Sequence, residues 1–224
     1  MSYIIVGLGN PGAEYENTRH NAGRLAVTNW AKAYQKEEEL SDWKFDKLLN
    51  AQKATGEVFP HVGHGGIPHV RRGERRGEKK KAEKVLVLLP ETFMNNSDKA
   101  LKDKIKSVKA AEKLVVVHDD LDLPLGTIKM VFNRGSGGHK GLESIIKAIK
   151  TQAFIRIRLG VCPTTPTGKP KKPVGDKLVD FIVGEFKPDE AKIFKKIEKR
   201  TAEAIDLILG EGKERAMGEV NSNK

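Results

Sequence analysis

Side chains that can activate water follow several apolar segments of the sequence. A histidine can take a proton from water, a carboxylate can fix the tautomer of its ring, and amide groups can donate hydrogen bonds to a developing oxyanion. Residues of these types at the predicted strand ends are Asn10, His20, Asn21, Asn95, Asn96, His118, Asp119, Asp120, Asp122 and His139. Their combination favours hydrolysis by activated water. An ester suits this chemistry, because its alkoxide leaving group needs less help than an amide nitrogen.

Nucleophilic and metal-dependent chemistries find less support in the sequence. It contains no G-x-S-x-G motif, and its one cysteine, Cys162, lies in no nucleophile signature. The run of one histidine and three aspartates at residues 118–122 could instead hold Mg²⁺. His61, His64 and His69 lie near one another, but they have no thiol neighbours and no obvious fourth ligand. A structural zinc site is therefore not expected among them.

Three glycines raise the possibility of a dinucleotide-binding turn. Gly7, Gly9 and Gly12 spell G-x-G-x-x-G directly after a strand-like run. However, Pro11 removes a backbone N–H that a bound pyrophosphate would use. Such a site also needs a second strand that ends in an acidic residue about 20 residues further on. The segment around Trp30 has helical spacing instead, so we expect no nicotinamide cofactor.

The apolar pattern predicts a single α/β domain. Continuous apolar runs, typical of central strands covered on both faces, occupy residues 3–6, 85–89 and 114–117. Weaker strand signals lie at residues 43–58, 127–132 and 154–161. Helical spacing occurs at residues 22–33, 98–109, 142–149 and 188–209. We predict a mixed, mostly parallel central sheet flanked by helices on both faces, with its polar clusters at the strand ends, where such sheets place active sites.

Two segments depart from the composition of this domain. Residues 59–84 carry eight lysines and arginines against three glutamates, together with many glycines. They cannot bury enough apolar surface to fold alone, so we predict a basic loop inserted between two strands. Residues 211–224 are polar, and we predict a frayed tail there. The domain proper is expected to span residues 1–210.

The charge of the chain favours an anionic partner. The formal net charge is +11 and the isoelectric point is about 9.6, which favours nucleic acid first and an acidic membrane second. A lone cysteine fits a reducing compartment. No apolar run approaches the roughly 20 residues that span a bilayer, and no secretory signal is visible. We therefore expect a soluble, cytoplasmic protein without a membrane partner.

Five motifs occur in order along the chain. They are G-L-G-N-P-G at residues 7–12, T-R-H-N-A-G at 18–23, P-E-T-F-M-N at 90–95, H-D-D-L-D-L-P at 118–124 and G-G-H at 137–139. Together they closely resemble the signature of the bacterial-type peptidyl-tRNA hydrolases, and the similarity extends through residues 154–160 and 179–186. The resemblance implies a monomeric α/β enzyme, without metal or cofactor, that cleaves the ester between a nascent peptide and its tRNA.

The resemblance also implies a role for each matching residue. His20 would be the general base, and Asp119 would be the carboxylate that orients it. Asn95 would position the water or the peptide carbonyl, and Asn10 would hold the peptide main chain or the terminal adenosine. Arg158 would face a tRNA phosphate. The full set of implied substrate-binding residues is Asn10, Tyr15, Phe93, Asn95, His139 and Lys140.

The chain departs from the family pattern at three positions. Lys140 replaces an asparagine, and Asp98 stands where the family usually has a glycine. Val131 replaces a basic residue, so Lys129 and Arg134 are its candidate substitutes for tRNA binding. The insertion is also longer than the family norm. These departures leave open the alternative of a non-hydrolytic, splicing-factor-like relative that only binds RNA.

Overall fold

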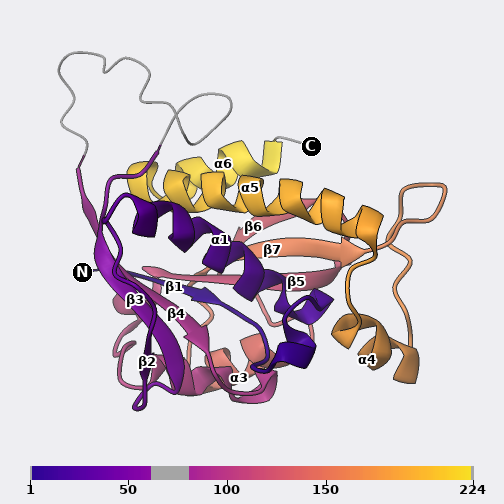
Figure 1. The fold of residues 1–224 in the computed structure, drawn as a ribbon, viewed down its shortest axis with the longest axis horizontal. Helices are drawn as coiled ribbons and strands as arrows, with labels where there is room; N and C mark the ends of the chain where they lie inside the picture. Colours follow the sequence, from indigo (N-terminus) through magenta and orange to yellow (C-terminus); the bar gives the residue numbers. More distant parts are fainter. Residues whose placement is uncertain (1, 62–80, 223–224) are drawn as a thin grey trace.

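A mixed β-sheet forms the centre of the computed structural model, which describes residues 2–61 and 81–222 (Figure 1). Its strands are β1 (Tyr3–Gly7), β2 (Lys44–Asp46), β3 (Ala51–Val58), β4 (Glu83–Pro90), β5 (Leu114–Pro124), β6 (Ile128–Phe132) and β7 (Ile155–Cys162). Within the described residues they lie in the order β2-β3-β4-β1-β5-β7-β6. The four inner strands are parallel, and the pairings toward both edges are antiparallel. The predicted mixed α/β sheet is confirmed, but it is not mostly parallel: among the described strands three pairings are parallel and three are antiparallel.

Helices cover both faces of the sheet, as predicted. Helices α1 (Ala22–Lys36), α5 (Pro188–Glu211) and α6 (Lys213–Ser222) pack on one face, and α3 (Lys140–Ile149) lies on the other beside the 3₁₀ segment η3 (Met94–Leu101) (Figure 1). Alternate residues of β1 supply the two cores: Ile5 faces the first, and Ile4 and Val6 face the second. No helix among residues 2–61 and 81–222 is long and apolar enough to cross a membrane.

The helix predicted at residues 98–109 is wrong. The chain instead forms η3 and, after a break, the short helix α2 (Val108–Ala111). Asp103 adopts a positive φ of 59°, which no α-helix accommodates. Ser107 then begins α2, because its side chain accepts a hydrogen bond from the backbone N–H of Ala110 at 3.1 Å. The lysine-rich sequence between the two segments offers no apolar face that would hold one continuous helix.

The C-terminal segment is also not the frayed tail predicted from its polarity. After Gly212, residues 213–222 form α6, in which Ala216 and Val220 are buried. The amide of Asn221 both donates to the carbonyl of Met130 and accepts from its N–H, each at 3.0 Å. It thereby pairs with the free edge of β6 as a neighbouring strand would. The sequence did not predict this helix, because its two buried apolar residues are too few to produce a recognisable helical pattern.

The basic insertion joins two neighbouring antiparallel strands, because β3 and β4 pair along their whole length. It is therefore inserted between two strands that pair with each other; the prediction that it is a loop falls mostly on residues outside the described part of the chain. Residues 62–80, which hold most of its charge together with His64 and His69, lie outside the described part of the chain.

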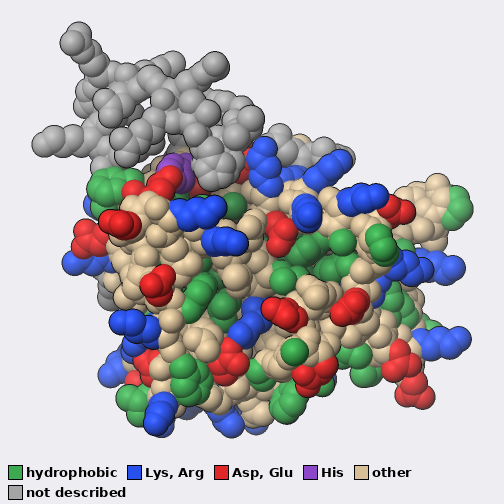
Figure 2. Space-filling model, viewed as in Figure 1, with side chains coloured by type: hydrophobic (Ala, Val, Ile, Leu, Met, Phe, Trp, Pro, Cys, Tyr) green, Lys and Arg blue, Asp and Glu red, His purple; other side chains and the backbone are tan. Residues whose placement is uncertain are grey.

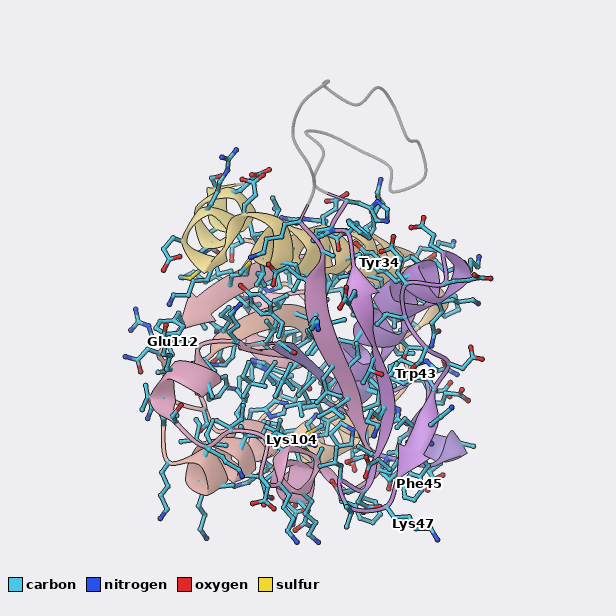
Figure 3. All side chains as sticks on the ribbon, turned by 90° about the vertical axis from the view of Figure 1, so that its left-hand side faces the viewer. Tyr34, Trp43, Phe45, Lys47, Lys104 and Glu112 are labelled. Atoms are coloured by element: carbon cyan, nitrogen blue, oxygen red, sulfur yellow. The ribbon has the colours of Figure 1, made fainter. Side chains whose placement is uncertain are left out.

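A buried carboxylate joins α1 to α5 near the base of this loop. Asp206 is 4% exposed, and its Oδ1 accepts hydrogen bonds from Trp30 Nε1 at 2.9 Å and from the Tyr34 hydroxyl at 2.8 Å. The Tyr34 hydroxyl also accepts from the backbone N–H of His61, so Tyr34 lies between α5 and the loop end of β3 (Figure 3). Burial raises the pKa of Asp206 to about 6.

The raised pKa of Asp206 predicts a loss of stability as the pH rises from 4 to above 6. The folded protein keeps this proton up to about pH 6, whereas the unfolded chain releases it near 3.8, so the stabilisation is complete only below the lower value. In Asp206→Asn the two donors keep their acceptor oxygen. Across this window the wild type should lose about 2–3 kcal/mol of unfolding free energy relative to the variant, measured by urea unfolding. A difference between the two proteins that does not change with pH would contradict the argument.

Candidate active site

His20 lies at the carboxyl ends of the central strands because a glycine allows a close approach of two backbones. It belongs to the 3₁₀ turn η2 (Arg19–Asn21), which leads directly into α1. A Cβ added at Gly23 would lie 2.1 Å from the carbonyl oxygen of Val117, so only glycine allows α1 to begin against β5. Leu8 N–H also donates to this carbonyl, which holds the end of β1 beside it. The turn is thereby placed over Asp119, two residues further along β5.

His20 and Asp119 are hydrogen bonded. The distance from His20 Nδ1 to Asp119 Oδ1 is 3.0 Å, and the Asp119 side chain is buried. A carboxylate accepts, so Nδ1 carries the proton and Nε2 keeps its lone pair. Burial lowers the pKa of His20, but the charge and hydrogen bond of Asp119 outweigh it, so that the pKa is raised. For Asp119 itself, burial raises the pKa, but the two neighbouring imidazoles outweigh burial and hold it far below its usual range.

His139 is the second imidazole beside this carboxylate. It is the N-cap of α3, where its Nδ1 accepts from the backbone N–H groups of Gly141 at 3.1 Å and Leu142 at 3.3 Å. Because an N–H can only donate, Nδ1 carries no hydrogen, and the ring proton of this tautomer is on Nε2. Nε2 therefore donates to Asp119 Oδ1, at 3.1 Å. One carboxylate oxygen accepts from both imidazoles, and His20 is the member of the pair whose second nitrogen has no hydrogen-bond partner among residues 2–61 and 81–222.

The same hydrogen bonds argue against a metal ion at this point. Within the described ranges, His20, Asp119 and His139 are the group whose ligand atoms lie within 4.8 Å of one another. In the helix-capping tautomer, however, Nε2 of His139 is protonated and has no lone pair for a metal. The alternative Mg²⁺ set is dispersed by the structure. Asp120 pairs with Arg158 and Asp122 pairs with Lys172, at 2.7 and 2.8 Å.

Asn10 ties three segments of the site together. Its backbone N–H donates to Asn21 Oδ1 at 2.7 Å, and Asn21 Nδ2 donates back to the Asn10 carbonyl at 3.0 Å. Asn10 Oδ1 accepts from the backbone N–H of Met94 at 2.8 Å. The turn that carries Asn95 is thus fixed against the turn that carries His20. Asn95 is exposed there.

The remaining predicted substrate residues lie at the rim. Tyr15 and Phe93 form an edge-to-face pair with ring centroids 6.3 Å apart, and Phe93 is 58% exposed. Lys140 is exposed and pairs with Glu143 at 3.2 Å, so the structure does not bring it to Asp119. Asp98 has no positive φ and binds Ser144, which joins η3 to α3. The turn therefore accommodates an aspartate at the position where the family usually has glycine.

A basic cavity lies on the outer strands beyond His118. It has a volume of about 590 Å³, and the predicted tRNA-binding residues Lys129, Arg134 and Arg158 all line it. Lys129 and Arg158 are cross-strand partners in β6 and β7. On the face seen in Figure 2, basic side chains are instead interspersed with acidic and apolar ones. The cavity is lined by four basic side chains, counting Arg156, and by the two acidic side chains of Asp120 and Asp122, so its lining is net positive.

Arg156 also lines this cavity, and it was not among the predicted site residues. It is buried, and its guanidinium donates to the carbonyls of Arg134 and Gly135, the latter at 2.6 Å. Burial, followed by the charges of Arg158 and Arg134, lowers its pKa to about 10. The alternation of Arg156 with Arg158 along β7 is the sequence signal that places both on one face. Arg156 thus holds the loop that leads to His139.

The capping geometry of His139 can be tested apart from any activity. At pH 8, ¹⁵N NMR of the ring should show a protonated Nε2 and a bare Nδ1; a proton on Nδ1 would contradict the arrangement. Both His139→Ala and His139→Asn lose the bond to Asp119, but asparagine can still cap α3. The free energy of unfolding of the alanine variant, measured by urea titration, should therefore be about 1 kcal/mol lower than that of the asparagine variant.

Comparisons with known proteins agree over the whole length of the chain. The sequence model of the peptidyl-tRNA hydrolase family matches residues 4–224. The peptidyl-tRNA hydrolase of Caldanaerobacter subterraneus is 38% identical over 220 residues, covering 98% of this chain and 99% of the relative. That of Aquifex aeolicus is 34% identical over 215 residues, covering 96% and 93%.

A solved structure has the same fold. The crystal structure of peptidyl-tRNA hydrolase from Acinetobacter baumannii superposes with a TM-score of 0.77 at 26% identity, covering 100% of this chain and 96% of that one. The family match spans the segments that carry His20, Asp119 and His139. The resemblance found in the motifs is thereby confirmed, and the chain belongs to the peptidyl-tRNA hydrolase family.

Proposed function

We propose that this protein hydrolyses the ester that joins a peptide to tRNA in peptidyl-tRNA, with His20 as the general base. The observation that carries this proposal is the hydrogen bond of 3.0 Å between His20 Nδ1 and the buried Asp119. It leaves His20 Nε2 as the nitrogen that accepts a proton from water. The family membership of the chain supports the substrate, since its relatives are named as peptidyl-tRNA hydrolases.

The proposed reaction needs no covalent enzyme intermediate. His20 Nε2 takes a proton from water while the water oxygen attacks the ester carbonyl carbon, giving a tetrahedral oxyanion. The oxyanion collapses, the bond to the tRNA 3′ oxygen breaks, and the imidazolium returns its proton to that oxygen. Asp119 stabilises the imidazolium between these steps. Because the pKa of His20 is raised, the base is free only as the pH rises through that pKa, and the rate should rise with it.

Two amides are placed to handle the peptide side of the substrate. Asn95 is exposed on a turn that Asn10 fixes in place, and we assign it to the attacking water or the peptide carbonyl. Asn10 has committed Oδ1 and its backbone groups to Met94 and Asn21, so its Nδ2 is the part assigned to substrate. His139 donates to Asp119, and we assign it to holding that carboxylate; its predicted contact with the substrate stays a prediction.

The tRNA side of the substrate has two candidate contacts. The half-buried Tyr15 and the exposed Phe93 offer an aromatic surface on which a terminal base can stack. The basic cavity offers Arg158, Lys129 and Arg134 to phosphates, and Arg158 is oriented there by its pairing with Asp120. Contacts of this kind weaken as salt rises, so KM should increase with ionic strength. We assign the protein to the cytoplasm as a monomer, in keeping with a role in recycling tRNA.

The proposal predicts that His20→Ala lowers kcat by roughly 10²–10⁴-fold, because the proton of water then has no acceptor. The measurement is release of tRNA from N-acetyl-aminoacyl-tRNA, with circular dichroism to show that the variant folds. His61→Asn removes a histidine near the inserted loop and should leave kcat unchanged.

Two outcomes would contradict the proposal in different ways. Wild-type protein that binds RNA tightly but releases no tRNA at any concentration would favour the non-hydrolytic RNA-binding alternative. Full turnover by His20→Ala would leave the activity standing but exclude His20 as the base.

A further inference from the structure

Helix α4 (Asp176–Val183) is a short element with little support of its own. None of its residues is buried, and its N-cap residue is Gly175, which has no side chain that could cap the helix. A helix of this length gains too little from its own hydrogen bonds to be stable in isolation. Its conformation must therefore depend on contacts with the rest of the fold.

Arg19 supplies those contacts from a position directly before His20. Its Nη1 donates to the carbonyls of Phe181 at 3.3 Å and Gly184 at 3.1 Å, and its backbone N–H also donates to Gly184, at 3.1 Å. Its guanidinium carbon lies 4.3 Å from the centroid of the Phe181 ring. A cation at the last carbonyls of a helix complements the helix dipole. The buried side chain of Arg19 thus caps the C-terminal end of α4.

The second branch of the guanidinium reaches the start of the next helix. Arg19 Nη2 lies 2.5 Å from Glu190 Oε2. The same carboxylate oxygen accepts a hydrogen bond from the backbone N–H of Lys187 at 2.8 Å, and this bond caps the start of α5. Backbone contacts extend the attachment, because Thr18 and Glu185 form an antiparallel bridge. The turn that carries His20 is therefore fastened to the junction between α4 and α5 on its outer side.

We propose that Arg19 is a positioning residue for His20, acting through this junction; the inference rests on the proposed function of His20 as the base. The 3₁₀ turn η2 has three residues and no side-chain cap. Its inner side is held by the bond from His20 to Asp119, and its outer side is held by Arg19. Loss of the outer attachment lets the turn shift, and a shift of about 1 Å at a reacting group is enough to cost a large factor in rate.

Arg19→Lys tests this assignment, because lysine keeps the charge near Glu190 but lacks the planar fork that reaches two elements at once. Provided that the wild-type protein is active, we expect the kcat of Arg19→Lys to be about tenfold or more below the wild-type value, while its KM changes less than about threefold. The imidazole of His20, followed by NMR, should also titrate at a lower pH than in the wild type, because its bond to Asp119 loosens. Arg215→Lys, an exposed arginine paired with Glu211 on the C-terminal side, is the matched control and should change neither quantity.

Wild-type kcat together with wild-type titration of His20 in Arg19→Lys would overturn the proposal, while the activity of the wild type would still support the proposed function. If Arg19→Lys fails to fold, Phe181→Leu decides, because it removes the stacked ring and leaves both carbonyls. That variant should lower both kcat and the titration midpoint of His20, though less than Arg19→Lys. A folded Phe181→Leu variant with wild-type values for both would likewise overturn the proposal.

Discussion

Asp119 carries a negative charge in the interior of the protein, and the rest of the site is arranged around it. Burial of an ionised carboxylate costs several kcal/mol unless hydrogen bonds and opposite charge compensate. Here two imidazole N–H groups converge on one carboxylate oxygen. The two rings make different use of the contact. The other nitrogen of His139 accepts from the backbone of α3, whereas the other nitrogen of His20 has no partner in the part of the chain that the structure describes.

Several unrelated segments must meet for this to happen. The parallel order β1-β5 brings the turn after β1 beside the end of β5. Gly23 permits α1 to begin against Val117, and Asn10 ties the turn of Met94 to the same place. Arg19 completes the set from outside by joining the turn to α4 and α5. Each contact is local in space but remote in sequence, so the precision of the site is a property of the tertiary fold.

From the sequence we could predict which residues belong to this candidate site more readily than which hydrogen bonds they form. Central strands were visible as continuous apolar runs, and polar residues in the turns that follow such runs meet at one edge of a parallel sheet. That reasoning reaches His20 and Asp119. It does not reach the capping role of His139, because a histidine at a helix start has no distinctive local pattern. The role of Arg19 depends on partners more than 160 residues away.

The errors in the fold have a similar cause. The helix predicted at residues 98–109 ignored the lack of an apolar face in the middle of that segment, where Asp103 has a positive φ and Ser107 caps a separate short helix. The polar C-terminal segment folds as α6 because Asn221 finds the open edge of β6, a partner that no local pattern reveals. The sequence placed Arg156 on the correct face of β7. Its burial and its hydrogen bonds to the loop before His139 could not be predicted, because they depend on the complete tertiary structure.

The buried charge of Asp119 sets the protonation of His20, and NMR titration of the His20 imidazole in wild-type and Asp119→Asn protein measures this dependence. In the wild type we expect a midpoint above 6.5, because the carboxylate outweighs burial. In Asp119→Asn burial acts without that charge, and the midpoint should fall below 6.5. Equal midpoints in the two proteins, or a wild-type midpoint below 6.5, would contradict it.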